Sequence, residues 1–376
     1  MTKPLDIVFV GLSLSSSWGN GHATTYRSLL KGLHALGHSV HFLERDVPWY
    51  AKARDLAAPG FCSLSFYKSV RDLAHEHGER LCNADAVIIG SYVPDGAAVI
   101  DTIACLAPKR LCFYDIDTPV TVSRLEQGDE KFLERGQLPL FDTYFSFSGG
   151  PILEQLVQRH GVRKAVPLHC SVDPDLYTNT GEAPSWDLGY LGTYSPDRQP
   201  GLERLLLEPA RRLPDRRFVV AGSQYPDLRW PENVERIEHL PPSEHASFYS
   251  RQRFTLNLTR SCMIAAGWSP SVRLFEAAAC AVPVISDDWP GLDDFFADGE
   301  AVVVARQSGD VVEALQELEE SRRRRIGLNA RRNVMRDHTG LERARELAEA
   351  LRMIVPREEK WTANAGRTGG RERTAL

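Results

Sequence analysis

The chain has 376 residues, enough for about two domains that each bury a core of their own. With 25% charged and 43% hydrophobic residues, its composition is that of a soluble globular protein and excludes disorder throughout. The formal net charge of −5 argues against a protein that binds nucleic acid by neutralising many phosphates, so we expect no nucleic-acid partner.

No stretch approaches the roughly 20 consecutive apolar residues of a membrane-spanning helix. The apolar run from Ile7 to Leu12 lacks a basic leader, and we interpret it as a first strand rather than a secretory signal. The seven cysteines are odd in number and contain no CxxC pair, which is typical of a reducing compartment. We therefore predict a cytoplasmic protein without a transmembrane segment. This leaves peripheral membrane contact and the oligomeric state open.

Short apolar runs alternate with amphipathic stretches in the first half of the chain. The clearest helix is predicted over 23–36, where leucines recur on one face and Gly37 supplies the stop. This alternation indicates a parallel sheet covered by helices on both faces. The predicted strands are Leu5–Leu12, Ser39–Glu44, Ala86–Ser91, Arg110–Asp115, Thr143–Phe147 and Ala165–His169.

The same alternation restarts after a polar stretch, Tyr177–Trp186, which we interpret as an interdomain linker. The sequence thus predicts an α/β protein of two tandem Rossmann-like, doubly wound domains, with ligands at the carboxyl ends of the strands, facing a cleft. The predicted parts are a first domain over 1–178, a second domain over 187–340, a C-terminal helix over 341–355 and a disordered tail over 356–376. Strands are expected at Leu188–Gly192, Phe218–Ala221, Val234–Glu238, Phe254–Leu258, Val282–Ser286 and Ala301–Val304, and helices at Gly201–Leu213, Pro242–Ser250, Pro270–Cys280 and Val311–Glu319.

The segment 268–288 carries the most informative chemistry. Ser269 is predicted to cap a helix that has Pro270 at its first position. Arg273 and Glu276 then lie three residues apart on that helix. A carboxylate there can accept both hydroxyls of a ribose, and the arginine can bind a diphosphate. A surface ion pair between Arg273 and Glu276 is the alternative interpretation.

These residues resemble the nucleotide-sugar segment of GT-B glycosyltransferases, in particular the CgeB-like (spore-maturation-type) group with a C-terminal domain of the glycosyl transferases group 1 type. The resemblance rests on the run from Ser271 to Asp287, with further matches at Gly192–Arg198, Phe218–Gly222, His239–Pro242, Leu256–Arg260 and Gly267–Pro270. It implies an activated nucleotide sugar held mainly by the second domain and an acceptor held mainly by the first. In relatives with an E-x7-E pattern the second Glu, matching Glu276, holds the ribose, whereas Trp268 stands at the position of the first.

Several further residues belong to the expected donor side. Gly192 lies in a loop of small residues after a strand, where backbone N–H groups approach phosphate and Arg198 supplies charge; an exposed loop arginine is the alternative. The loop that begins at His239 follows another strand and is expected to contact the base, although its prolines also suit a structural turn. Together the expected donor-binding residues are Gly192, Thr193, Arg198, His239, Arg260, Trp268, Ser271, Arg273 and Glu276.

In the first domain, Gly19, Asn20 and Gly21 form an acceptor-side loop between the first strand and the first helix. His22 follows this loop and is a candidate catalytic base for an acceptor hydroxyl, with a helix-capping or solvated histidine as the alternative. The loop does not match the G-x-G-x-x-G dinucleotide fingerprint, which argues against hydride transfer.

Asp115 and Asp117 are the acidic candidates of the first domain. They follow a buried strand, and their spacing predicts that both point the same way in extended chain. They are candidates to orient His22, to bind acceptor hydroxyls or to act as the base, while capping of the next segment is the alternative.

We expect no bound metal and no cofactor beyond a nucleoside diphosphate sugar as co-substrate. No His, Cys or Asp cluster has zinc-site spacing, and the pattern Asp115-Ile-Asp117 lies in the domain expected to hold the acceptor. The sequence thus predicts a metal-independent transfer of a sugar to an unidentified acceptor. The alternatives are an epimerase of nucleotide sugars and a nucleotide-sugar-binding protein without catalytic activity.

Overall fold

The computed structural model describes residues 3–18 and 21–357, and the chain divides into two units. The first unit comprises the described residues of Met1–Phe147, Leu153–Leu168 and Arg343–Leu376, and the second Ser148–Ile152 and His169–Glu342. The chain therefore enters the second unit at His169, before the polar stretch 177–186. Each unit is built on one parallel sheet, as the alternation of strands and helices predicts.

The first unit has a seven-stranded sheet in the order β3-β2-β1-β4-β5-β6-β7. All its ladders are parallel, so the strands end at one edge. The strands are β1 (Asp6–Gly11), β2 (Ser39–Arg45), β3 (Ser63–Tyr67), β4 (Ala86–Gly90), β5 (Leu111–Asp115), β6 (Thr143–Ser146) and β7 (Ala165–Pro167). The helices are α1 (Gly21–Ala35), α2 (Pro48–Ala51), α3 (Val70–Asn83), α4 (Gly96–Cys105), α5 (Thr118–Glu126), the 3-10 helix η1 (Arg135–Leu140), α6 (Pro151–His160) and α15 (Gly340–Arg352).

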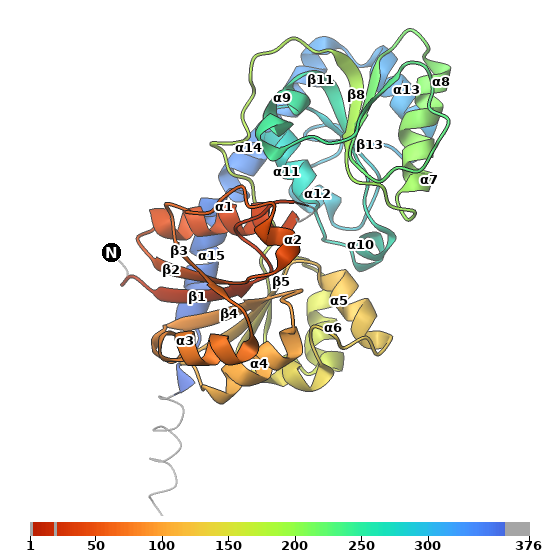
Figure 1. Ribbon diagram of the computed structural model, residues 1–376. Helices are drawn as coiled ribbons and strands as arrows, with labels where there is room; N and C mark the ends of the chain where they lie inside the picture. Colours follow the sequence, from red (N-terminus) through yellow and green to blue (C-terminus); the bar gives the residue numbers. More distant parts are fainter. Residues whose placement is uncertain (1–2, 19–20, 358–376) are drawn as a thin grey trace, which may run out of the picture. The chain divides into compact units, whose positions relative to one another are not determined.

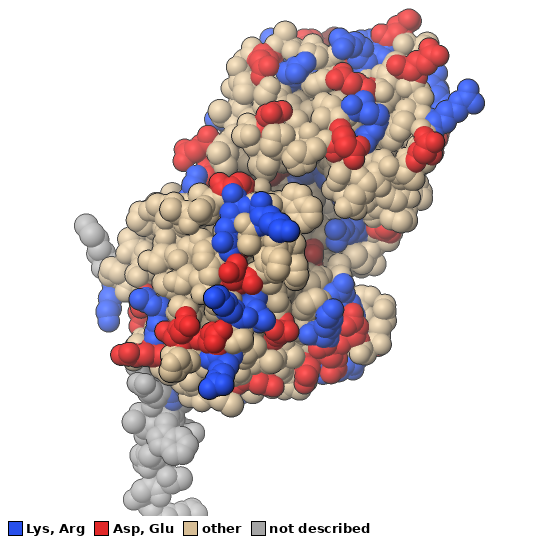
Figure 2. All heavy atoms as spheres, viewed as in Figure 1, with Lys and Arg blue, Asp and Glu red and all other residues tan. Residues whose placement is uncertain are grey.

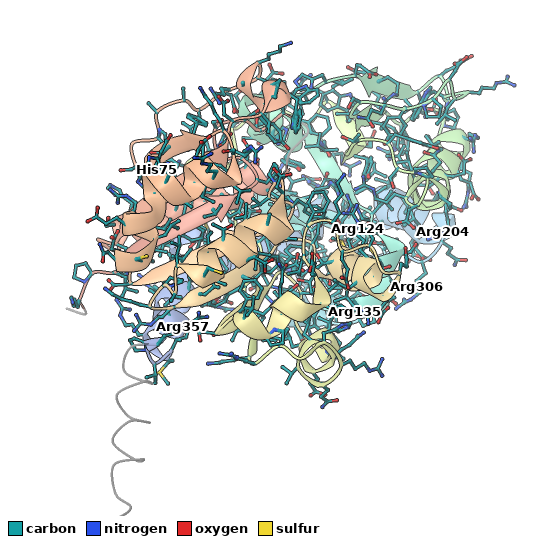
Figure 3. All side chains as sticks on the ribbon, turned by 60° about the horizontal axis from the view of Figure 1, so that its bottom comes forward. His75, Arg124, Arg135, Arg204, Arg306 and Arg357 are labelled. Atoms are coloured by element: carbon teal, nitrogen blue, oxygen red, sulfur yellow. The ribbon has the colours of Figure 1, made fainter. Side chains whose placement is uncertain are left out.

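Helices cover both faces of this first sheet, with α1 and α15 on one face and α3 and α4 on the other (Figure 1). Leu347 and Leu351 of α15 are buried in the same cluster as Ile7 and Phe9 of β1. The last helix of the described residues thus completes the core around the first strand. Beyond its end, Arg357, labelled in Figure 3, donates to Asp142 and to the carbonyl of Leu140.

The second unit has a six-stranded parallel sheet in the order β10-β9-β8-β11-β12-β13. Figure 1 shows α7, α8 and α13 along one face and α9, α11 and α14 along the other. The strands are β8 (Trp186–Leu191), β9 (Phe218–Ala221), β10 (Val234–Ile237), β11 (Gln252–Asn257), β12 (Val284–Ser286) and β13 (Val303–Val304). The helices are α7 (Gln199–Leu202), the π-helical turn η2 (Glu203–Leu207), α8 (Glu208–Arg212), the 3-10 helix η3 (Pro242–Glu244), α9 (His245–Ser250), α10 (Ser261–Ala266), α11 (Val272–Ala279), α12 (Leu292–Phe295), α13 (Ser308–Glu317) and α14 (Glu320–Asp337).

Two local predictions differ from the structure. The strand β3 is missing from the predicted strands, because its Leu64 and Phe66 are only half-buried at the sheet edge and give a weak apolar signal. The helix expected to begin at Pro270 begins at Val272. The backbone at 338–340, between α14 and α15, pairs with Val172.

Charged side chains of both signs are interspersed on the visible face of each unit (Figure 2). That face therefore shows no single-sign patch of the kind that binds a polyanion. No helix in the described parts of the chain is long and apolar enough to cross a membrane.

Candidate functional site

Two glycines shape the strand ends of the second unit. A Cβ at Gly222, whose φ is +145°, would collide with the carbonyl of Gly192, so these backbones pack too closely for any side chain. A Cβ at Gly192 would in turn lie 3.1 Å from a guanidinium nitrogen of Arg273. The hydroxyl of Tyr225 donates to the Gly192 carbonyl at 3.1 Å. The loop after β8 is thereby fixed beside Arg273, while Thr193 is exposed.

Three arginines of the second unit lie within electrostatic range of one another. Burial lowers the pKa of Arg198, and repulsion from Arg273 and Arg260 lowers it further. Within residues 3–18 and 21–357, none of the three forms an ion pair with a carboxylate. The Nε of Arg198 is buried without a hydrogen-bond partner among the described residues. A cluster of cations with unused donors is suited to binding an anion.

A buried polar network fixes one of these arginines. Asn257, at the end of β11, accepts hydrogen bonds from Ser271 at 2.7 Å and from Arg273 at 3.3 Å. The Nε of Arg273 donates to the carbonyl of Leu191, and its guanidinium lies 5.0 Å from the ring centroid of Tyr190. Strand ends and the start of α11 together thus set the orientation of this guanidinium.

The α11 start corrects one sequence expectation. Ser271, not Ser269, occupies the N-cap position, and no side chain caps the helix. The hydroxyl of Ser269 is directed elsewhere: it donates to the Gly267 carbonyl at 2.8 Å and lies 2.6 Å from the Ser148 hydroxyl.

Glu276 is buried, with 5% of its surface exposed, on the second turn of α11. Its carboxylate accepts a hydrogen bond from the hydroxyl of Tyr249 at 3.0 Å. No ion pair joins it to Arg273 within the described chain, so the alternative of a surface pair is wrong. Burial raises the pKa of Tyr249 well above its usual value, and the Glu276 charge raises it further. Tyr249 therefore stays protonated and remains a donor to the carboxylate.

The other two expected donor residues lie at separate loops of the second unit. His239 is exposed after β10. Trp268 has a φ of +43°, and its indole N–H donates to the carboxylate of Asp294. Because an indole only donates, Trp268 cannot replace an accepting glutamate.

In the first unit, His22 and Asp117 are neighbours. His22 lies in the first turn of α1, and its Nε2 is 3.5 Å from a carboxylate oxygen of Asp117. Asp117 occupies the N-cap position of α5 but forms no side-chain cap bond there. The histidine also contacts the ring of Tyr92 edge-on, at a centroid distance of 5.5 Å. Gly21 is the exposed first residue of α1, whereas Gly19 and Asn20 lie outside the described residues.

Asp115 is fully buried and faces inward, so the expectation that it points the same way as Asp117 does not match the structure. Its carboxylate accepts hydrogen bonds from Tyr144 at 2.5 Å, from Thr121 at 2.9 Å and from the backbone N–H of Asp117 at 3.2 Å. Burial raises the pKa of Asp115 to about 6, against the opposing effect of these hydrogen bonds. Asp115 thus holds the start of α5 and with it Asp117.

A second buried carboxylate, which sequence reasoning missed, orders the loop after β1. Glu44 accepts four hydrogen bonds, from the hydroxyls of Ser13 (3.0 Å) and Ser15 (2.7 Å) and from the N–H groups of Leu14 (2.7 Å) and Ser15 (2.9 Å). Arg27 donates to the Leu14 carbonyl from the other side. The serine-rich run 13–17 was the available signal, because such a run needs buried acceptors when it is not exposed.

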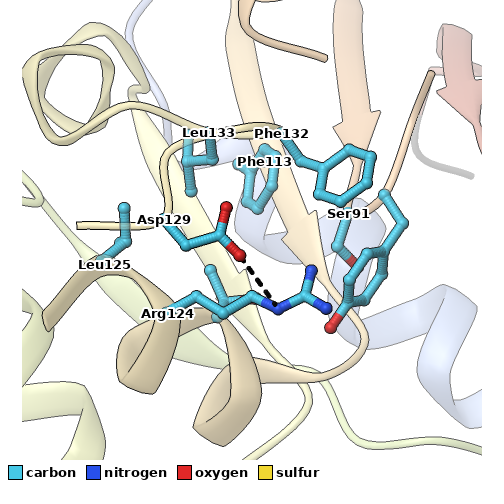
Figure 4. A pocket seen from close by; sticks show the side chains of 9 residues that line it. Ser91, Phe113, Arg124, Leu125, Asp129, Phe132 and Leu133 are labelled. Carbon is cyan, nitrogen blue, oxygen red and sulfur yellow. Dashed lines mark ion pairs between the residues drawn. The ribbon is translucent and has the colours of Figure 1, made fainter. Parts of the chain in front are cut away.

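The first unit has an apolar hollow (Figure 4). Phe113, Phe132, Leu125 and Leu133 line it. Arg124 also lines it and forms an ion pair with Asp129 at 3.8 Å. Tyr92, which lines the hollow and contacts the ring of His22, has a φ of +60°, a strained conformation for an aromatic residue.

Among the described residues, no group of three His, Cys, Asp or Glu side chains is placed to hold a metal ion. His75, in the His-x-His pattern of α3, is exposed (Figure 3). His77 is half-buried, and burial lowers its pKa.

Comparison with known proteins gives a family match over part of the chain and a likeness in fold over most of it. Residues 198–349 match the family described as "Glycosyl transferase-like". No curated protein matches the chain. Solved structures that are similar over most of their length include sucrose-phosphate synthase from Thermosynechococcus elongatus, at 13% identity and a TM-score of 0.66, covering 92% of this chain and 98% of that one. The Anabaena protein HepE in complex with UDP and glucose matches at 11% identity and a TM-score of 0.66, covering 92% and 99%. An alpha-glucosyltransferase in complex with UDP matches at 12% identity and a TM-score of 0.68, covering 92% and 99%.

The chain as a whole therefore has the fold of GT-B glycosyltransferases, as predicted. The segment 198–349, which matches the glycosyl transferase-like family, contains the three arginines and Glu276.

Proposed function

We propose that this protein is a glycosyltransferase that moves a sugar from a UDP-sugar to a hydroxyl of an acceptor without a bound metal. The observation that carries the proposal is the cluster of Arg198, Arg260 and Arg273 beside the glycine loop at the strand ends, without a carboxylate partner in the described chain. The UDP complexes of HepE and of the alpha-glucosyltransferase, which share the fold, support the choice of base.

In this proposal the arginines bind the diphosphate of the donor. They stabilise the negative charge that develops on the leaving UDP, which is the task a metal ion performs in other transferases. Glu276 accepts hydrogen bonds from the ribose, and the loop that begins at His239 contacts the base. Membership of the CgeB-like group and a cytoplasmic location stay predictions.

On the acceptor side, His22 takes the proton of the attacking hydroxyl, with Asp117 stabilising the imidazolium that forms. This assigns an inverting transfer, because a base beside the acceptor is needed when the hydroxyl attacks the face of the sugar opposite the leaving group. Asp115 is a positioning residue in this scheme, since its carboxylate is enclosed by protein donors.

A thermal-shift screen of UDP, GDP, dTDP, ADP and CMP tests the donor class, because a ligand that binds the native state raises the melting temperature. We expect UDP to give the largest shift and uridine a much smaller one. Incubation with UDP-sugars should then release UDP only when an acceptor is added. A new nucleotide sugar formed from donor alone would indicate an epimerase, and the lack of any nucleotide shift would contradict the proposal.

A further inference from the structure

Glu276 is held by more than its own helix. Tyr249 of α9 donates to it at 3.0 Å. Burial and the charge of Glu276 raise the pKa of Tyr177, which lies nearby. Both tyrosines are buried, with exposures of 0% and 2%. Two buried tyrosines from distant parts of the chain therefore lie near one buried carboxylate, and one of them donates a hydrogen bond to it.

The same tyrosines are connected to the loop after β10. The Tyr177 hydroxyl lies 3.3 Å from Nδ1 of His245, and Nε2 of that histidine lies 3.3 Å from the carbonyl of Leu240. His245 and Tyr249 are four residues apart on α9, with ring centroids 6.4 Å apart. One short helix thus contacts both the backbone of the loop and the carboxylate.

We infer that Tyr249 is a positioning residue that orients Glu276 toward the ribose, and that Tyr177, through its contact with His245 on the same helix, couples this carboxylate to the loop that contacts the base. This inference rests on the proposed function. A carboxylate has two oxygens, and donors on one side leave the remaining lone pairs directed at the ligand. The coupling fixes the spacing between the base contact and the ribose contact, so the nucleotide meets a preformed site.

The charge balance supports this arrangement. A buried carboxylate is stable only with hydrogen-bond donors around it. Arg273 on the same helix does not pair with it in the described chain, and the Tyr249 hydroxyl supplies a donor. It does so without neutralising the carboxylate, which keeps it a strong acceptor for a ribose hydroxyl.

The test compares Kd values for UDP and 2′-deoxy-UDP by isothermal titration calorimetry. Wild type should prefer UDP by roughly 10-fold or more, the ratio expected for a hydrogen bond to a charged group. Tyr249→Phe should lower this preference by about 3-fold or more while changing the Kd for 2′-deoxy-UDP much less, since only the ribose contact is misplaced. If Tyr249 had only a structural role, Tyr249→Phe would raise the Kd values for both ligands by the same factor.

Tyr67→Phe is the matched control, because Tyr67 is also buried but its hydroxyl has no partner among the described residues. It should leave the ratio unchanged. Tyr177→Phe is the second variant and covers the case in which Tyr249→Phe does not fold, as judged by circular dichroism. A folded Tyr variant with the wild-type ratio overturns the positioning role. Wild type that binds UDP without ribose preference overturns it too, whereas wild type that binds no UDP contradicts the proposed function instead.

Discussion

Nε2 of His22 lies 3.5 Å from a carboxylate oxygen of Asp117, although His22 lies in the first turn of α1 and Asp117 at the N-cap of α5. Each residue follows a strand of the first sheet, β1 or β5, and parallel strands end at the same edge. The pair is the arrangement in which a carboxylate orients an imidazole that takes up a proton.

Substitution of His22 tests this pair. His22→Ala should lower kcat by about 10²–10⁴-fold if His22 is the base, while the Kd for UDP stays nearly constant. Asp117→Asn should lower kcat less, because the imidazole remains. The loss in kcat of the double variant should then be smaller than the product of the two single losses, since both residues act through one proton transfer. Near-normal turnover of His22→Ala would exclude the histidine as base.

Arg273 and Arg198 are tested with UDP against uridine. Arg273→Gln should raise the Kd for UDP by roughly 10-fold or more through the loss of a charge-assisted hydrogen bond, and should hardly change the Kd for uridine. Arg198→Gln should have the same effect. Arg204→Gln is the control, since Arg204 is an exposed arginine of the same unit (Figure 3). Equal losses for both ligands would mean that these arginines stabilise packing rather than bind phosphate.

The pKa of Asp115 predicts a pH dependence of stability. Burial raises it to about 6, so the folded protein keeps a proton that the unfolded chain releases above about pH 4. Its contribution to stability is present below pH 4 and is lost as pH rises through 6, by roughly 3 kcal/mol in total.

Melting temperatures of wild type and Asp115→Asn between pH 4.5 and 7 check this expectation. The difference between the two proteins should change in favour of the variant as pH rises. A constant difference would show that Asp115 ionises as freely in the folded protein as in the unfolded chain.

Because the Glu44 carboxylate orders the loop 13–16, its substitution should destabilise this loop. Glu44→Gln places an amide N–H₂ among four donors, which should cost about 2 kcal/mol or more in the free energy of unfolding. Urea denaturation measures this loss. Ser65→Ala, on the half-buried edge strand β3, should cost much less. A wild-type midpoint for Glu44→Gln would contradict the anchoring role.

The sheets could be predicted from sequence because their central strands are nearly continuous apolar runs. Phe218–Ala221, for example, is both the predicted and the observed extent of β9. The edge strand β3 lacks such a run. Its pairing with β2 is a tertiary effect that local pattern does not reveal.

The contacts of the candidate site residues could not be predicted from the sequence. The spacing of Arg273 and Glu276 suggested an ion pair, yet their partners come from β8, β11 and α9. Tyr249 lies in an apolar helix and reads as a core residue, because a hydroxyl contact 27 residues away leaves no local signal. The inward direction of Asp115 likewise depends on Tyr144 of the neighbouring strand.

The position of α15 has a consequence for biosynthesis. Ala344, Leu347, Leu351 and Ile354 complete the core that begins at Ile7, so the first unit lacks part of its interior until the ribosome has made residue 354. Domains that are continuous in sequence fold one after the other as they emerge. The first sheet is synthesised early, but its core is complete only after α15 has been synthesised. In the interval its apolar surface is open to a chaperone.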